Sequence, residues 1–276
     1  MDLPEFLAIG HVARDIGDGG LATGGTAAYG ALAASRLGLR ASIVTSAGPD
    51  LVFSPSGVQL HTVLSDETTT FRNVYALGER TQHLDSVAGP ISPGDVPPEW
   101  RHAPMVLLGP LTGEVDHELA RHFPNSLVVA SLQGWLRRWD TGGRVAARAW
   151  DGLEVLPYVD AAVVSEKDFE DGRLVDLWAG IAEILIVTMG RMGARLHTRG
   201  RWHDIPPFPA KEVDPTGAGD VFAAAYLARY RETGDPLESA RFAGAAASLT
   251  VEAPGVSSIP TRTQVEARLE RGSQAP

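Results

Sequence analysis

The first 45 residues constrain the fold most, because they alternate short apolar runs with a glycine turn and a helix-length stretch. Residues 6–9 are an apolar run of the kind found in buried strands. An Ala-rich stretch, 26–37, follows Gly24-Gly25 and is closed by another glycine, the usual stop signal of a helix. Residues 41–45 form the next apolar run. This order predicts a βαβ unit, and therefore an α/β fold with parallel strands.

The same alternation continues along the chain. Short apolar runs predict further buried strands at 105–108, 127–131, 159–165 and 183–188. Helical stretches are expected at 115–122, 143–150, 220–230 and 237–251, and a hairpin at 195–203. No linker, repeat or low-complexity tract divides the sequence, so we expect a single domain over residues 1–276, with a frayed tail at 272–276.

A second hairpin is expected in the first half of the chain. Residues 68–76 and 80–84 alternate polar and apolar side chains on either side of Gly78. We place this hairpin at a sheet edge, where residues 61–87 could form a small β cover.

Composition excludes several classes of function. The net charge of -10 opposes binding to a phosphate backbone, so we expect no nucleic-acid partner. The absence of cysteine excludes disulfides, thiolate catalysis and Cys-ligated zinc. The N-terminus lacks the features of a signal peptide, and no apolar run has the length of a membrane span. We therefore expect a cytoplasmic chain without a membrane partner.

The stretch 213–223 carries the clearest chemical signal. Small residues form a turn that opens onto a helix, where unpaired backbone N–H groups and the helix dipole can bind an anion. Asp220 lies at the start of this helix and has two interpretations, a helix cap or a general base for a hydroxyl group. The Gly-Ala-Gly spacing before it favours the base, since a simple cap does not need that spacing.

The sequence Asp-Pro-Thr-Gly-Ala-Gly-Asp at 214–220, followed by Val-Phe-Ala, resembles the C-terminal signature of the ribokinase family, also called the PfkB carbohydrate kinases. The resemblance implies a three-layer α/β/α Rossmann-like core with a mostly parallel central sheet. It also implies ATP and Mg²⁺ as co-reactants, with Asp220 as the base. Its anion hole would be formed by Gly217, Ala218 and Gly219. Asp214 and Thr216 match positions that hold a monovalent cation, such as K⁺, in some members.

On the acceptor side, the resemblance implies substrate contacts at Asp15 and at the pair Gly24-Gly25. A carboxylate suits polyols because it accepts hydrogen bonds from two hydroxyl groups. The family usually has Asn at the position of Tyr29. Arg137 is a further candidate for a substrate or phosphate contact, and its alternative is an exposed, solvated arginine.

On the donor side, Ser165 and Asp168 replace the Asn and Glu of the Asn-x-x-Glu motif of the family. Asp168 keeps the carboxylate that would act on Mg²⁺, indirectly through water. Thr188 and Gly190 match a Thr-x-Gly that touches the nucleotide in relatives. Gly244 stands where the family often has Asn beside the adenine.

Few residues separate Asp15 from Gly24, where many members carry a lid of β-strands. The lid is therefore expected to be reduced or absent, as in the short members that include archaeal nucleoside kinases and myo-inositol kinases. The resulting hypothesis is an ATP-dependent kinase that phosphorylates a small polyol, sugar or nucleoside, as a monomer or homodimer. The alternative is a non-catalytic ligand-binding or regulatory paralogue, which the departures at Tyr29, Ser165 and Gly244 would suit.

Overall fold

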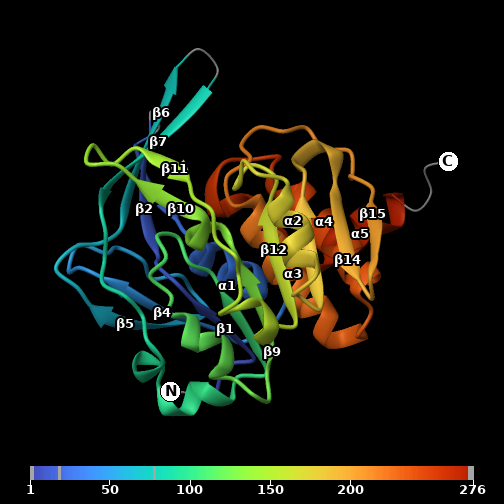
Figure 1. Ribbon diagram of the computed structural model, residues 1–276, viewed down its shortest axis with the longest axis horizontal. Coiled ribbons are helices and arrows are strands. Elements are labelled where there is room, and N and C mark those ends of the chain that lie inside the picture. Colours follow the sequence, from blue (N-terminus) through green and yellow to red (C-terminus); the bar gives the residue numbers. More distant parts are fainter. Residues whose placement is uncertain (1–2, 18–19, 77–78, 273–276) are drawn as a thin grey trace.

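A large mixed sheet forms the centre of the computed structural model, which describes residues 3–17, 20–76 and 79–272 (Figure 1). Its nine strands lie in the order β15-β14-β13-β12-β9-β8-β1-β4-β5. In chain order they are β1 (Phe6–Ile9), β4 (Ala41–Ala47), β5 (Val58–Leu64), β8 (Met105–Leu108), β9 (Leu127–Ser131), β12 (Ala161–Ser165), β13 (Ile184–Thr188), β14 (Ala194–Thr198) and β15 (Arg201–Ile205). All neighbours are parallel except the edge hairpin β14–β15 and its pairing with β13.

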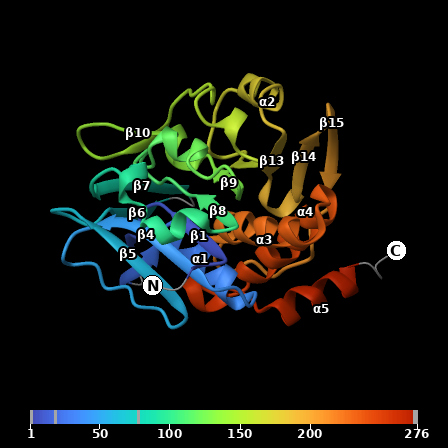
Figure 2. The same ribbon diagram turned by 90° about the horizontal axis from the view of Figure 1, so that it is seen from below.

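Helices cover one face of this sheet, as Figure 2 shows. They are α1 (Thr26–Arg36), α3 (Ala218–Thr233), α4 (Pro236–Thr250) and α5 (Arg262–Gly272). The opposite face carries α2 (Arg173–Ala179) and short 3-10 turns. The 3-10 turns of the whole described chain are Pro93–Asp95, Pro98–His102, His117–Arg121, Gln133–Leu136, Leu156–Tyr158, Gly190–Met192 and Gly255–Ser258. The three expected layers are therefore present.

The two faces are filled by different side chains. Alternate residues of β1 point to opposite faces, so Phe6 and Ala8 join the core under the helices while Leu7 and Ile9 join the other core. The helix side is rich in alanine, which lets α1 and α3 lie close together. The opposite side is filled by large indole rings, those of Trp100, Trp135, Trp150 and Trp178.

A second, four-stranded sheet covers one end of the molecule (Figure 1). It has the order β3-β2-β6-β7, with β2 (Ala13–Gly17), β3 (Gly20–Gly24), β6 (Thr70–Ala76) and β7 (Glu79–Ser86). The predicted hairpin at 68–84 is confirmed, but it belongs to this separate sheet, and its turn at Gly78 lies outside the described residues. The expected cover at 61–87 differs from the observed one in two ways. Residues 61–64 belong to β5 of the central sheet, and residues 13–24 supply two strands of the cover. The short interval before Gly24 thus holds a complete strand pair.

Two expected helices are absent from the described structure at their predicted places. Residues 143–150 include the strand β11 (Val145–Ala147), which pairs with β10 (Arg137–Trp139). Residues 115–122 form only the 3-10 turn that begins at His117. In the part of the chain that the structure describes, no helix has both the length and the apolar character needed to cross a membrane.

The order of the strands marks where a ligand should bind. From β1 the chain moves to β4 and β5 on one side and later to β8 and β9 on the other side. In open α/β sheets, ligands bind beyond the carboxyl ends of the strands where this direction reverses. Here that point lies between Gly10 and Gly109, which directly follow β1 and β8. A Cβ at Gly10 would lie 2.2 Å from the Gly109 carbonyl oxygen, so the backbones meet closely.

Candidate active site

Asp220 lies in the first turn of α3, close to the switch point of the sheet. Gly217 is the N-cap of α3 in the left-handed conformation, with φ of 79°, and the Val221 amide donates to its carbonyl at 2.9 Å. Asp220 is therefore the third helical residue rather than the N-cap. Its carboxylate reaches across to α1, where Oδ1 accepts a hydrogen bond from the Thr26 hydroxyl at 2.6 Å. The capping interpretation of Asp220 does not describe this geometry.

The surroundings of Asp220 change its acidity. Burial raises the pKa of Asp220 to about 6, against the opposing effects of the Thr26 hydrogen bond and the Arg137 charge. The charges of Asp168 and Asp15 raise it further. The structure thus brings three residues predicted from separate parts of the sequence into electrostatic range of Asp220. A carboxyl group with a pKa near neutrality is suited to general base catalysis.

The turn before Asp220 is tightly packed. A Cβ at Gly217 would lie 2.1 Å from Cε1 of Tyr29, so the tyrosine ring rests directly on the glycine backbone. The left-handed φ and this contact each require glycine. Burial, and then the charges of Asp220, Asp214 and Asp15, raise the pKa of the Tyr29 hydroxyl, which stays protonated. Tyr29, a departure from the family pattern, therefore supports the turn itself.

The backbone amides at the start of α3 are the groups predicted to bind an anion, and they differ in whether they are free to do so. The Ala218 amide donates to the Pro215 carbonyl oxygen at 3.3 Å. The amides of Gly219 and Asp220 lie in the first turn, where no helical carbonyl precedes them by four residues. Gly219 is exposed. Of the predicted residues 217–219, Gly219 is thus the one whose amide is best placed for an incoming anion.

Asp15 and the glycine pair meet on the acceptor side. Asp15 lies on β2 and is half-buried. A Cβ at Gly24 would lie 2.3 Å from Asp15 Oδ2, so the carboxylate packs against that glycine. Gly25 is the N-cap of α1 with φ of 103°, and a Cβ there would lie 2.3 Å from the His11 carbonyl oxygen. The pair is therefore more than a simple turn, since it lets the carboxylate and the helix start approach each other.

Arg137 is the first residue of β10 and is half-buried rather than fully solvated. Its guanidinium donates to the Leu111 carbonyl oxygen at 3.3 Å and lies 5.4 Å from the centre of the Phe71 ring. Together with its effect on the pKa of Asp220, these contacts place a positive charge beside that carboxylate.

A buried polar network lies beneath the acceptor side. The carboxylate of Glu114 accepts hydrogen bonds from the backbone amides of His11, Leu111 and Thr112, at 2.7–3.1 Å. Burial alone would raise the pKa of Glu114, but nearby His11 and these amides outweigh burial and lower it. His11 Nε2 lies 2.9 Å from the Gly89 carbonyl oxygen, and His11 Nδ1 lies 2.7 Å from Thr69 Oγ1. The network joins the end of β1 to Thr69, which directly precedes strand β6 of the covering sheet.

On the donor side, Ser165 ends β12 and Asp168 follows in a turn. The Asp168 carboxylate accepts hydrogen bonds from the Ser165 amide at 3.0 Å and from Gln133 Nε2 at 3.1 Å. This half-buried carboxylate is fixed near Asp220 and offers the hard oxygen ligands that suit Mg²⁺. In the described ranges, no group of three or more His, Asp or Glu side chains is arranged to hold a metal by itself. The residues thus fit an ion that takes its other ligands from phosphate and water.

The other donor-side candidates, Thr188, Gly190 and Gly244, differ in their local surroundings. Thr188 ends β13 and its hydroxyl donates to the Val164 carbonyl oxygen at 3.4 Å, while Gly190 begins an exposed turn with φ of 53°. An ion pair between Arg191 and Glu212, at 3.0 Å, ties this turn to the segment before Asp214. Gly244 lies within α4, where a Cβ would contact the Phe208 ring at 3.7 Å.

The loop that contains Asp214 and Thr216 is held by hydrogen bonds that its backbone amides donate. Asp214 Oδ1 accepts the Thr216 amide at 2.9 Å. The amides of Val213 and Asp214 both donate to the Val251 carbonyl oxygen, at 2.7 and 3.1 Å. These contacts fix the loop to the C-terminal end of α4.

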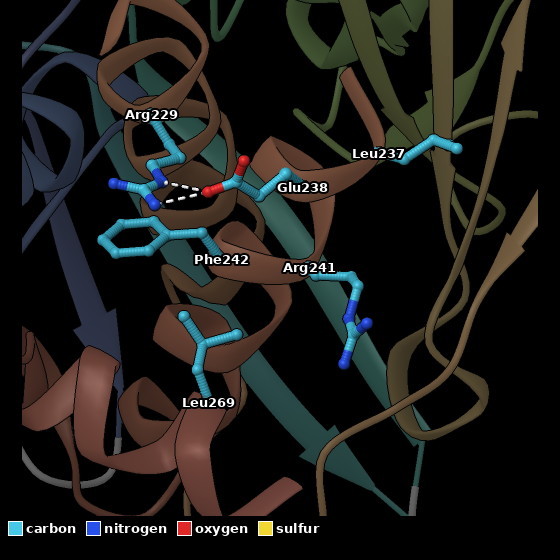
Figure 3. Close-up of a pocket in the computed structure, with 6 residues that line it drawn as sticks. All are labelled: Arg229, Leu237, Glu238, Arg241, Phe242 and Leu269. Carbon is cyan, nitrogen blue, oxygen red and sulfur yellow. Dashed lines mark hydrogen bonds and ion pairs between the residues drawn. The ribbon is translucent and has the colours of Figure 1, made fainter. Parts of the chain in front are cut away.

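A separate groove lies near the C-terminal end of α3, as Figure 3 shows. It has a volume of about 360 Å³ and is lined by Arg229, Leu237, Glu238, Arg241, Phe242 and Leu269. Arg229 is already paired with Glu238 in this groove. None of the residues predicted for chemistry lines it, so it is not part of the candidate site.

Two of the residues in the site were not predicted to act there. Thr26 and His11 are both fully buried polar residues, and the sequence carries no spacing signal for either. Their partners, Asp220 and Thr69, are 194 and 58 residues away along the chain. Only the fold brings these pairs together.

Comparison with known proteins finds similar kinases. The pfkB family carbohydrate kinase model matches residues 148–263. Cytidine kinase of Thermococcus kodakarensis is 28% identical over 269 residues, which cover 85% of this chain and 91% of that protein. Fructokinase-1 of Zea mays is 32% identical over 127 residues, which cover 43% of this chain and only 37% of that protein.

Among solved structures, a pyrophosphate-dependent kinase in the ribokinase family, complexed with a pyrophosphate analog and myo-inositol, has the same fold. The TM-score is 0.78 at 24% identity, and the match covers 95% of this chain and 99% of that chain. The predicted family resemblance and the predicted α/β/α fold are confirmed.

Proposed function

We propose that this chain, which carries a PfkB family domain and has the ribokinase fold, is a kinase that transfers the γ-phosphate of ATP to a hydroxyl group of a small molecule. The observation that carries the proposal is the position of Asp220. Its carboxylate has a pKa raised to about 6, lies in the same helical turn as the Gly219 amide, and is surrounded by Asp15, Arg137 and Asp168.

In the proposed reaction, Asp220 accepts the proton of the acceptor hydroxyl as that oxygen attacks the γ-phosphorus. The new O–P bond forms while the bond to the ADP oxygen breaks, and the pair of electrons leaves with ADP. The first-turn amides of α3 stabilise the negative charge on the transferring group. Mg²⁺, when bound near Asp168, would neutralise charge on the phosphates. Asp214 and Thr216 belong to the proposal as ligands of a monovalent cation.

The acceptor in this proposal is a polyol, sugar or nucleoside. The half-buried carboxylate of Asp15 can accept hydrogen bonds from two hydroxyl groups of such a molecule. The names of the similar proteins support the same range, since they include a cytidine kinase and an inositol 3-kinase. Donor contacts are assigned in the proposal to Ser165, Thr188, Gly190 and Gly244.

The substitution Asp220→Asn tests the assigned base. It is expected to keep ATP binding and to lower kcat by roughly 10²–10⁴, the usual contribution of a general base. ADP release would be measured over myo-inositol, ribose, fructose, adenosine and cytidine. Asp235→Asn is a matched control, because Asp235 is an acidic residue at the start of another helix, where it caps α4. Near-native turnover by the Asp220 variant would remove Asp220 from this role.

The second candidate function is a non-catalytic binding protein, favoured by the Tyr29 ring that fills the space beside Gly217. The same screen separates the two functions. Nucleotide binding without ADP release for any acceptor would support the binding protein and contradict the kinase.

A further inference from the structure

Thr26 is held in one orientation by the packing around it. The residue is fully buried at the first position of α1. A Cβ at Gly109 would lie 2.5 Å from Thr26 Cγ2, so the threonine methyl packs directly on the glycine that follows β8. With the methyl group in that place, the hydroxyl is directed to Asp220, and the oxygens lie 2.6 Å apart.

This contact joins the two helix starts that form the site. Thr26 follows Gly25, the N-cap of α1, and Asp220 follows the glycine turn that caps α3. Each helix is fixed against the same sheet, with α1 over β1 and α3 over β8 and β9. The hydrogen bond therefore spans two rigid elements, and small side-chain motions do not easily break it.

We infer that Thr26 is a positioning residue whose hydroxyl fixes Oδ1 of Asp220 and so assigns the transfer of the acceptor proton to Oδ2. This inference rests on the proposed role of Asp220 as the base. Thr26 touches neither reacting atom in this scheme, and it acts only through the carboxylate.

The electrostatics of the site support the inference. A hydrogen bond donated to a carboxylate favours the charged form. The Thr26 hydroxyl and the Arg137 charge lower the pKa of Asp220, whereas burial and the charges of Asp168 and Asp15 raise it. Tyr29 is the other titratable group beside this carboxylate, and its own raised pKa keeps it neutral. Loss of the Thr26 donor must therefore raise the pKa of Asp220.

The sign of the kinetic effect follows. A base must be deprotonated, so kcat/KM falls as the pH falls through the pKa of Asp220. If that pKa rises, the acid limb of the profile moves to higher pH. Thr26→Val removes the hydroxyl but keeps both branches of the side chain, while Thr26→Ser keeps the hydroxyl and loses the methyl group.

The test compares two midpoints, that of the pH profile of kcat/KM and that of an NMR titration of the Asp220 carboxyl carbon. The NMR signal of this carbon is identified by its absence in the Asp220→Asn variant. Thr26→Val is expected to move both midpoints up by about one pH unit, which matches a hydrogen bond to a charged group. Thr26→Ser is expected to keep the native midpoints. An unchanged midpoint in Thr26→Val, or an equal shift in Thr26→Ser, would overturn the inference.

Two further measurements keep the outcomes distinct. Thr26→Ala gives a second variant without a donor, and thermal unfolding of each variant checks that the fold is retained. The NMR titration needs no turnover. If Asp220 titrates as expected while no acceptor is phosphorylated, the proposed kinase fails and the contact between Thr26 and Asp220 stands. If turnover is present but the midpoints do not move, the positioning role fails alone.

Discussion

The acceptor and donor sides of the candidate active site are held by different kinds of contact. Beneath the acceptor side, the buried carboxylate of Glu114 accepts several backbone amides, and His11 links β1 to the covering sheet. On the donor side, the turn after β13 is tied by the pair Arg191–Glu212, in which the arginine side chain is 78% exposed. Breaking a buried polar contact lowers the free energy of unfolding far more than breaking an exposed ion pair does.

This difference matches the different binding needs of the proposed acceptor and the proposed phosphate donor. A small neutral acceptor brings little binding energy, so its site must be formed in advance. A phosphate donor carries charge that can itself attract arginine and backbone amides. Rigid contacts are therefore concentrated where the acceptor would lie, and exposed contacts where the donor would lie.

The largest effect is expected from Glu114→Gln on the acceptor side. The glutamine NH₂ group would replace one of the two carboxylate oxygens. The amide of Thr112 or, in the other orientation of the side chain, that of His11 would then face a donor and lose its acceptor. We expect the free energy of unfolding to fall by about 2–4 kcal/mol, as for a buried charged group that loses its partners. Urea unfolding measures this loss. If the free energy of unfolding fell by less than the loss expected for an exposed ion pair, the idea that buried contacts make the acceptor side rigid would be contradicted.

An intermediate effect is expected from Gly217→Ala, at the junction of the two sides. The alanine methyl would meet the Tyr29 ring, and the left-handed φ of 79° disfavours any residue with a Cβ. The expected loss is about 1–3 kcal/mol, measured by the same unfolding experiment. Gly219→Ala is the matched control, since a Cβ there meets nothing within 4 Å. Equal losses in the two variants would show that the Tyr29 contact has no role.

The smallest effect is expected from Glu212→Gln on the donor side. The hydrogen bond from Arg191 lowers the pKa of Glu212, so the pair stabilises the fold above the unfolded pKa of the carboxyl and loses this effect as the pH falls. Because the pair is exposed, the loss should not exceed about 1 kcal/mol at neutral pH. Unfolding at pH 7 and pH 3 checks both statements. A fall in the free energy of unfolding as large as that of Glu114→Gln would show that the two sides do not differ in rigidity.

Much of the fold could be predicted from local pattern. The apolar runs at 6–9, 105–108 and 127–131 became strands with the predicted bounds, because a strand buried on both faces needs a continuous apolar run. The stretch 143–150 has a helical composition but forms a strand, since its backbone pairs with β10. Its partner ends at Trp139, just before this stretch, and helix propensity read over 143–150 alone does not include that backbone pairing.

The candidate site shows the same limit. Asp220, Asp15 and Asp168 could be predicted because each sits in a motif. Thr26 could not be predicted, since its role depends on a methyl contact with Gly109 and a hydroxyl contact with Asp220. Both contacts arise only when distant segments pack together.

The bond between Thr26 and Asp220 also has a consequence for the order of events during synthesis. Its two partners lie 194 residues apart, and β1 lies in the interior of the sheet rather than at an edge. A ribosome-bound chain that ends before α3 holds α1 and the covering sheet but lacks Asp220. With Asp220 as the proposed base, the nascent protein would gain its chemistry only in its last stage, when α3 packs beside α1.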